Sequence, residues 1–304
     1  MPNDAPSIAL DVNAFIGGFP FRHLPHPDPE VLRRVLAREG VRRAWVGHLP
    51  SAFHRDPAHG NAELFARLAP FGDILRASPI VRPDWPNWRD TLRDCVDQGA
   101  PAIRIYPQLW GMVAGDAGLA HLAEACAVAG VAVVLTVRFE DLTQRHVLDV
   151  AADLSAAHVR ELARSGTGAR LVVTAAGREF IEEVHWGLTP AERVMVSYDF
   201  SWVWGPPTDE LAMLVRTMGV ERFVHGTMWP LRLTQGARAN LALLPDDLRV
   251  GVLAHSDMHA PGAIAAMREQ TRRYSRGEID FAGVRSEMLT AFPADGINVI
   301  LASF

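Results

Sequence analysis

The sequence predicts a single α/β domain built as a (β/α)8 barrel, and three observations lead to this prediction. Eight short apolar segments alternate with amphipathic helical segments along most of the chain. The most apolar segment, residues 131–137, is rich in β-branched residues, as is typical of a strand covered on both faces in a parallel sheet. The chain has 304 residues, and such barrels commonly need about 250 residues in one domain.

Proline, glycine and capping residues mark where these segments begin and end. Asp28, Pro29 and Gly40 are typical of the N-cap, the first turn and the stop of a helix over residues 29–39. The predicted strands are residues 7–12, 41–47, 74–81, 102–106, 131–137, 171–174, 194–198 and 223–225. The other predicted helices are residues 61–69, 87–98, 119–129, 143–164 with one break, 179–186 and 208–218.

The end of the barrel is predicted near residue 260. Residues 231–260 would supply its last helix, so the barrel takes residues 1–260 and residues 261–304 form a C-terminal helical extension. No Gly/Ser-rich linker separates the two parts, and we therefore expect the extension to pack on the barrel.

Composition narrows the class of protein. Hydrophobic residues make up 49% and charged residues 21%, as in globular domains. The net charge of -5, without a basic block, argues against nucleic acid or a membrane surface as partner. Cys95 and Cys126 both fall in helical segments, which indicates free thiols in a reducing compartment. Without a leader-like start or a run of ~18 apolar residues, the expected location is cytoplasmic.

The segment after the last predicted strand carries a family resemblance. It reads RFVHGTMWP over residues 222–230 and resembles the last barrel strand of the amidohydrolase superfamily, in the amidohydrolase-2 branch of TIM-barrel metal-dependent hydrolases and decarboxylases. That strand typically reads "GTD-aromatic-Pro". Met228 stands where the resemblance implies an aspartate that coordinates a divalent metal or acts as a base beside it, and a thioether does neither for a hard ion.

The other ligand positions that the resemblance implies are also changed. Residues 11–17 resemble the family's "D-x-H-x-H-x-x-G" segment, with Asn13 and Phe15 in place of the two histidine ligands. Thr136 or Val137, and residues 174–176, stand where further histidines are implied. The prediction is therefore a barrel that has lost its metal site and needs no cofactor. The alternative is a divalent metal such as zinc held by atypical ligands.

Polar residues near the predicted strand ends are the candidates for ligand binding, because barrel enzymes place their sites there. Arg82, Arg104 and Arg138 would favour a small anionic molecule, since each guanidinium binds a carboxylate with two hydrogen bonds. The alternative is a buried ionic network with Glu140, Asp141 and Asp199 that replaces the metal. The full set of candidate substrate-binding residues is Asn13, His48, Arg82, Arg104, Tyr106, Arg138 and Trp229.

Three residues are candidates for acid or base catalysis. Asp199 ends the seventh predicted strand, where a carboxylate serves either as a general base or as a cap of the next helix. Asp141 and His146 follow the fifth strand. If Thr143 caps the next helix, His146 falls in the first turn and leans over the barrel mouth; otherwise the segment is a solvated helix start.

These observations lead to competing hypotheses for function. The first is an amidohydrolase-related hydrolase or decarboxylase that acts on, or binds, a small carboxylated molecule without the family's metal. The second is a non-catalytic structural or interaction protein whose barrel mouth is filled by side chains. A metal-dependent hydrolase with atypical ligands is the third, and the resemblance leaves a homodimer open. A cavity lined by Arg82, Arg104 and Arg138 would favour the first hypothesis, and a filled mouth the second.

Overall fold

The computed structural model of the chain describes residues 8–72, 74–202 and 208–258, together with residues 273, 276–278 and 283. The predicted extension over residues 261–304 falls outside the described residues except at those few positions, so its packing remains a prediction. None of the helices in the described part combines the length and the apolar character needed to cross a membrane.

The described strands form two parallel sheets, ordered β1-β2-β3 and β4-β5-β6-β7-β8. A backbone bridge between Ile80 and Arg104 links the first sheet to the second. At the other edges, Val12 N donates to His225 O at 3.0 Å, and Phe15 N donates to Trp229 O at 2.7 Å. The strands are β1 (Ile8–Ile16), β2 (Val41–His48), β3 (Leu75–Ala77), β4 (Ala102–Ile105), β5 (Ala132–Thr136), β6 (Leu171–Thr174), β7 (Val196–Asp199) and β8 (Phe223–Val224).

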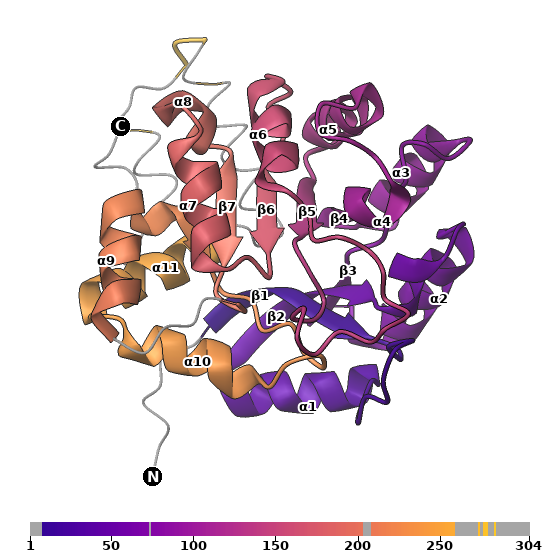
Figure 1. Cartoon of the computed structure of the whole chain (residues 1–304), viewed down its shortest axis with the longest axis horizontal. Helices are drawn as coiled ribbons and strands as arrows, with labels where there is room; N and C mark the ends of the chain where they lie inside the picture. The colour runs from indigo at the N-terminus through magenta and orange to yellow at the C-terminus, as the bar shows by residue number, and fades with distance from the viewer. Residues whose placement is uncertain are drawn as a thin grey trace.

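Helices alternate with the strands and surround them, which confirms the predicted α/β class (Figure 1). Glycines in the left-handed conformation end two of these helices, Gly40 after α1 (φ 72°) and Gly130 after α5 (φ 80°). The helices are α1 (Pro29–Glu39), α2 (Ala58–Leu68), α3 (Trp88–Asp97), α4 (Pro107–Trp110), α5 (Ala117–Ala129), α6 (Ala156–Arg164), α7 (Arg178–Trp186), α8 (Pro190–Arg193), α9 (Thr208–Met218), α10 (Thr234–Leu243) and α11 (Asp246–Met258).

The predicted helix over residues 143–164 is wrong in its first half, because α6 begins only at Ala156. Residues 138–155 form instead a loop folded around the side chain of Arg145. Its guanidinium donates to the backbone oxygens of Ala151 (2.6 Å) and Glu140 (3.1 Å) and forms an ion pair with Asp153. These contacts give the backbone oxygens of the irregular segment hydrogen-bond partners in place of helical ones.

Smaller differences concern element ends. β1 continues to Ile16 past a register shift between Asp11 and Ala14, which is typical of a β-bulge and was not predicted. α2 begins at Ala58 rather than at residue 61, and β3 is limited to Leu75–Ala77. The predicted last helix over residues 231–260 is two helices, α10 and α11.

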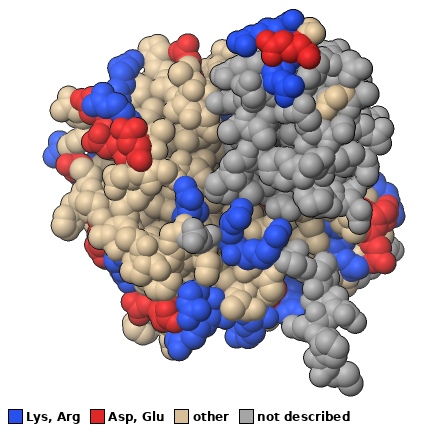
Figure 2. All heavy atoms as spheres, turned by 180° about the vertical axis from the view of Figure 1, so that it is seen from behind, with Lys and Arg blue, Asp and Glu red and all other residues tan. Residues whose placement is uncertain are grey.

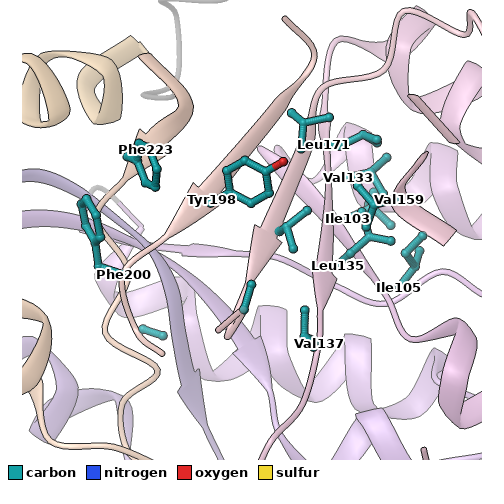
Figure 3. Packing of buried hydrophobic residues seen from close by; sticks show 14 of the residues in the cluster. Ile103, Ile105, Val133, Leu135, Val137, Val159, Leu171, Tyr198, Phe200 and Phe223 are labelled. Atoms are coloured by element: carbon teal, nitrogen blue, oxygen red, sulfur yellow. The ribbon is translucent and has the colours of Figure 1, made fainter. Parts of the chain in front are cut away.

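Alternation along the strands separates an outer core from the barrel interior, because successive side chains of a strand point to opposite faces. Ile103, Val133 and Leu171 pack in the outer core with helical residues such as Val159 of α6 (Figure 3). The interior cluster contains strand residues alone: Leu10, Val12, Trp45, Ala102, Ala132, Val134, Val172 and Val224. The polar residues that follow these inward positions by two, among them Arg104, Thr136 and Thr174, therefore point inward as well.

Charged side chains lie mainly at the surface. In the view from behind, basic and acidic residues are interspersed around the edge of the molecule (Figure 2). Many form short-range pairs along one helix, such as Arg33 with Glu30 at 2.6 Å and Arg178 with Glu182 at 2.8 Å. Such exposed pairs contribute at most about 1 kcal/mol each, so the buried charges of the barrel interior matter more for this fold.

Candidate functional site

The interior of the barrel contains a completely buried arginine, Arg104 of β4. Its Nη1 donates to Asn13 Oδ1 at 3.1 Å and its Nη2 to the backbone oxygen of Val12 at 3.4 Å. Tyr106 is buried beside Arg104, and each of the two groups affects the pKa of the other. The ring of Phe15 lies over the guanidinium, with 4.4 Å between Cζ and the ring centroid. Burial lowers the pKa of Arg104, and its neighbour Tyr106 opposes this shift.

The second buried charge is Asp199, at the end of β7. Its Oδ2 accepts from Asn13 Nδ2 at 2.9 Å, and its Oδ1 accepts from the Ala175 backbone at 3.0 Å and from Ser201 Oγ at 2.9 Å. Burial raises the pKa of Asp199 to about 6, although these hydrogen bonds favour the charged form. Asn13 thus connects the cation and the anion, because its oxygen faces Arg104 and its nitrogen faces Asp199.

Asp11 fixes the connection between the first and last strands. Its Oδ1 accepts from the backbone nitrogens of Asn13 (2.9 Å) and Thr227 (3.1 Å), and its Oδ2 accepts from Thr227 Oγ1 at 2.5 Å. Met228 N in turn donates to Asn13 O at 2.6 Å. These bonds, together with the one from Phe15 N to Trp229 O, hold Asn13, Phe15 and Met228 at the same end of the barrel.

Two glycines make the room that the buried charges need. A Cβ on Gly47 of β2 would lie 2.7 Å from Arg104 Nε and 2.9 Å from a ring carbon of Phe15. A Cβ on Gly226 would lie 2.8 Å from Asp199 Cβ and 3.0 Å from its Cγ. Any larger residue at either position would compete with a charged group for the same space.

Gly226→Ala is expected to lower the free energy of unfolding by about 1 to 3 kcal/mol, as overpacking of a filled core does. The new methyl group would press on the Asp199 carboxylate, which cannot move without losing its hydrogen bonds to Asn13, Ala175 and Ser201. Urea unfolding measures the change. Gly236→Ala is the matched control, since a Cβ at this helical position meets nothing within 4 Å and should be neutral or stabilising. Equal stability of the Gly226 variant and the wild type would contradict a fixed carboxylate.

An aromatic layer covers the buried charges on the side of the strand ends. We use this name for Phe15, Phe19, Phe53, Tyr106 and Phe139. Phe139 is at its centre, with ring centroids 5.4 Å from Phe53, 5.4 Å from Tyr106 and 6.0 Å from Phe15. Met228 and Trp202 are buried in the same cluster. In the described part of the chain, side chains therefore fill the space above Arg104.

A hollow of about 300 Å³ lies at the same end of the barrel, and we call it the rim hollow. Its walls come from the segments that follow β2, β3, β4 and β5 and from Phe21 after β1. Burial raises the pKa of Asp149 in its wall, and Arg145 opposes this shift. The lining residues are Phe21, Ala52, Phe53, His54, Arg55, Arg82, Leu109, Trp110, Leu148, Asp149, Val150 and Ala151.

The structure separates the three arginines that the sequence predicts at one mouth. Arg104 is buried in the interior, and Arg82 lines the rim hollow. Arg138 forms an ion pair with Asp153 at 3.0 Å and lies 5.5 Å from the centroid of Trp202. The predicted pairings of these arginines with Glu140 and Asp141 are wrong. Glu140 pairs with Arg22 instead, and Asp141 accepts a hydrogen bond from the Thr143 hydroxyl, with the charge of Arg138 further lowering its pKa.

Other predicted binding residues also lie apart. His48 is buried at the end of β2, where its Nδ1 is 2.6 Å from Ser51 Oγ and its Nε2 is 3.5 Å from a Glu63 oxygen. Burial lowers the pKa of His48. Trp229 is half-buried and packs against the outer core. Both positions are outside the rim hollow, whereas Asn13, Arg104 and Tyr106 come together in the interior.

The remaining catalytic candidates are at the surface. Asp141 accepts hydrogen bonds from the backbone and side chain of Thr143 (3.0 and 2.7 Å), and these bonds lower its pKa. His146 is exposed and stacks on Phe21, with ring centroids 5.9 Å apart. It does not start a helix, but its contact with Phe21 places it beside the rim hollow. Neither residue contacts Asp199, so the structure does not bring the three candidates together.

The sequence interpretation missed several residues of this region. Gly47 and Phe139 carry no local signal, because an isolated glycine or phenylalanine in a strand or loop has many structural explanations. Arg55 and Asp149 lie in loops and become neighbours of the hollow only through the fold. Asp11 lies within the segment that carries the family resemblance, but the sequence did not indicate its partner. The structure shows that Asp11 accepts hydrogen bonds from Thr227.

The residues at the implied metal-ligand positions have other roles in the structure. Asn13 is hydrogen-bonded to Arg104 and Asp199, and Phe15 covers the guanidinium. Met228 is buried in the same hydrophobic cluster as the aromatic layer. The hydroxyl groups of Thr136 and Thr174 are hydrogen-bonded to each other, with 3.0 Å between their oxygens. Within the described ranges, no group of three or more His, Cys, Asp or Glu side chains is arranged to hold a metal ion.

Comparison with known proteins places the fold. Neither a family model nor a curated protein matches the chain. Solved structures do, and they include proteins named amidohydrolases, in line with the resemblance found in the sequence. A TIM-barrel protein from Bordetella bronchiseptica is 12% identical with a TM-score of 0.58, over 84% of this chain and 99% of that one. The chain therefore has the predicted (β/α)8 fold.

Two further matches are named for enzymes. Dihydroxybenzoic acid decarboxylase from a Polaromonas species, with manganese and 2-nitroresorcinol bound, is 12% identical with a TM-score of 0.61, over 86% of this chain and 97% of that one. A protein named as a probable 2-pyrone-4,6-dicarboxylic acid hydrolase from Acinetobacter baumannii, with citric acid bound, is 10% identical with a TM-score of 0.53, over 81% of this chain and 99% of that one. At these identities the likeness extends to the fold and not to the reaction.

Proposed function

We propose that this barrel works without a divalent metal and binds a small carboxylated molecule in the rim hollow, as a metal-independent relative of amidohydrolase-type hydrolases and decarboxylases. The observation that carries the proposal is the guanidinium of Arg104, which lies completely buried among residues at the implied ligand positions. A permanent cation at that place supplies positive charge that the fold would otherwise receive from a metal ion.

The side chains present do not suit a divalent metal. Asn13 offers its oxygen to Arg104, so this oxygen is already used. Phe15 and Met228 provide no ligand for a hard ion. Asp199 is a carboxylate of the interior, but four donors from Asn13, Ala175 and Ser201 already surround it. A metal ion would also be repelled by the guanidinium beside it.

The rim hollow supports the ligand part of the proposal. It lies where barrel enzymes bind substrates, at the carboxyl ends of the strands, and two arginines line it. Arginine recognises carboxylates through paired hydrogen bonds. The solved structures with this fold that hold citric acid or 2-nitroresorcinol favour a small anionic ligand too. His146, stacked on Phe21 of the hollow, is the predicted acid or base closest to such a ligand.

A non-catalytic role is the second candidate, and the aromatic layer favours it. Asp199 has the raised pKa that a general base needs, but the layer of Phe15, Tyr106 and Phe139 covers it. Under this candidate the protein binds the carboxylate without converting it. Incubation of the protein with carboxylates that bind, followed by analysis for released carbon dioxide or hydrolysis products, separates the two.

Elemental analysis of the purified protein tests the metal-free proposal. We expect zinc and manganese well below one equivalent per chain, and the same melting temperature before and after dialysis against a chelator, because under this proposal Arg104 takes the place of the metal. The control is a second sample expressed in medium supplemented with zinc and manganese. One equivalent of either metal in the barrel, lost together with stability on chelation, would contradict the proposal.

A further inference from the structure

The rim hollow has one positive charge without a partner among the described residues. This charge belongs to Arg55. Arg82 binds Asp84 with two hydrogen bonds, at 3.1 and 2.7 Å, and its Nη1 donates to the backbone oxygen of Arg55 at 3.2 Å. Asp149 on the other loop has Arg145 at 3.8 Å. The Arg55 guanidinium has no hydrogen bond or ion pair within the described residues.

The Arg55 guanidinium is nevertheless held in place. Its Cζ lies 5.6 Å from the ring centroid of Trp85, and Arg82 lies 5.9 Å from the same ring. Arg82 also lies 5.1 Å from the centroid of Trp110, so the four side chains form a ladder of alternating arginine and tryptophan. Contact with an aromatic face leaves the planar edge of a guanidinium available for hydrogen bonds. Arg55 is therefore partly ordered before any ligand arrives, which reduces the entropy cost of binding.

The remaining walls of the hollow are apolar. Phe21 and Phe53 meet edge to face, with centroids 5.3 Å apart, and Trp110 and Leu109 line another part. Leu148 and Val150 come from the loop over residues 138–155 and are 72% and 89% exposed, so they have much apolar surface still to cover. A ligand that suits these walls has a flat apolar body and one anionic head.

We propose that Arg55 anchors the anionic head of the ligand, that Arg82 positions Arg55, and that the ligand is a monoanion whose flat apolar body lies against Phe53 and Trp110. This inference rests on the proposed function and adds its anchor and ligand class. The carboxylate faces Arg55 rather than Asp149, because a carboxylate beside Asp149 would be repelled. The site lies above the aromatic layer, so no group of the barrel interior takes part in binding.

Titration calorimetry on the full chain tests the inference with 2-naphthoate, benzoate, hexanoate and the uncharged benzamide as probes. The variants are Arg55→Gln and Arg55→Lys. Arg89→Gln is the matched control, since Arg89 also lies over a tryptophan (Trp88, 4.3 Å) but outside the hollow. We expect Arg55→Gln to weaken naphthoate binding roughly ten- to hundredfold, as loss of a charge-assisted pair does, and Arg55→Lys to retain part of the affinity. Arg89→Gln should bind like the wild type, and benzamide far more weakly than benzoate.

The possible results distinguish the anchor, the shape of the ligand and the carboxylate site. If carboxylates bind the wild type and Arg55→Gln equally well, the anchor is wrong while the proposed function stands. If hexanoate binds as tightly as naphthoate, the proposal that the ligand has a flat apolar body is wrong. If no probe binds the wild type, both the anchor and the proposed carboxylate site fail, whatever the metal analysis gives. Melting curves of the variants show whether they fold like the wild type. We expect unchanged melting temperatures for the Arg55 variants, because Arg55 is exposed.

Discussion

Arg104→Ala is expected to lower the free energy of unfolding by about 3 to 5 kcal/mol, as the loss of one partner from a buried charge network does. The substitution removes the cation that faces Asn13 and Tyr106, and it leaves Asp11 and Asp199 in the interior without that positive charge. It also leaves a cavity under Phe15, since Gly47 on the neighbouring strand cannot fill it. Urea unfolding at neutral pH measures the loss.

A second variant separates charge from volume. Arg104→Met fills most of the space without the charge, so it should recover part of the loss and remain less stable than the wild type. Arg89→Ala is the control for removal of an arginine from a tryptophan face at the surface, and we expect a change within about 0.5 kcal/mol. A loss below about 1 kcal/mol for Arg104→Ala would mean that the interior does not depend on its cation, against the role proposed for Arg104.

The pH dependence of stability should report on Asp199. Burial raises its pKa from 3.8 to about 6 in the folded protein. Between about pH 4 and pH 6 the folded state therefore binds more protons than the unfolded state, so this residue makes the protein less stable as the pH rises. The raised pKa corresponds to a destabilisation of about 3 kcal/mol. This destabilisation is absent below the pKa of the unfolded state and complete above the pKa of the folded state.

The test compares urea unfolding of the wild type and Asp199→Asn from pH 4 to pH 7. Subtracting the variant's curve removes the other titrating groups, and the stability of the wild type relative to the variant should fall with rising pH. Asp141→Asn provides a control of opposite sign, because the bonds from Thr143 lower the pKa of Asp141. A difference curve for Asp199 that is flat, or that rises with pH, would contradict a buried carboxylate with a raised pKa.

The pattern of elements was accessible from the sequence because its signals are local. Strand residues 102–106 and 171–174 alternate between two buried environments, and glycines such as Gly40 and Gly130 end helices in a conformation that other residues avoid. Asn13, Phe15 and Met228 could likewise be recognised as departures from a metal-binding pattern. The structure places all three at one end of the barrel.

The loop over residues 138–155 defeated local interpretation for a physical reason. The sequence predicts a helix from residue 143, but Arg145 binds backbone oxygens and Asp153 within the loop itself. A side chain with several donors can supply the hydrogen bonds that the backbone of an irregular segment needs. The predicted position of His146 in a first helical turn failed with that helix.

The sequence by itself determined the alternation of eight strands with helices, the α/β class and the residues that stand where the family resemblance implies metal ligands. Only the tertiary structure decided which charges meet. Asn13 bonds to Arg104 and to Asp199 across 91 and 186 residues of chain, and no local pattern encodes such pairs. The choice of partners depends on which strand ends converge and on how much water burial removes. The same reason made Arg55, rather than the predicted arginines, the charge of the rim hollow without an ion-pair partner among the residues that the structure describes.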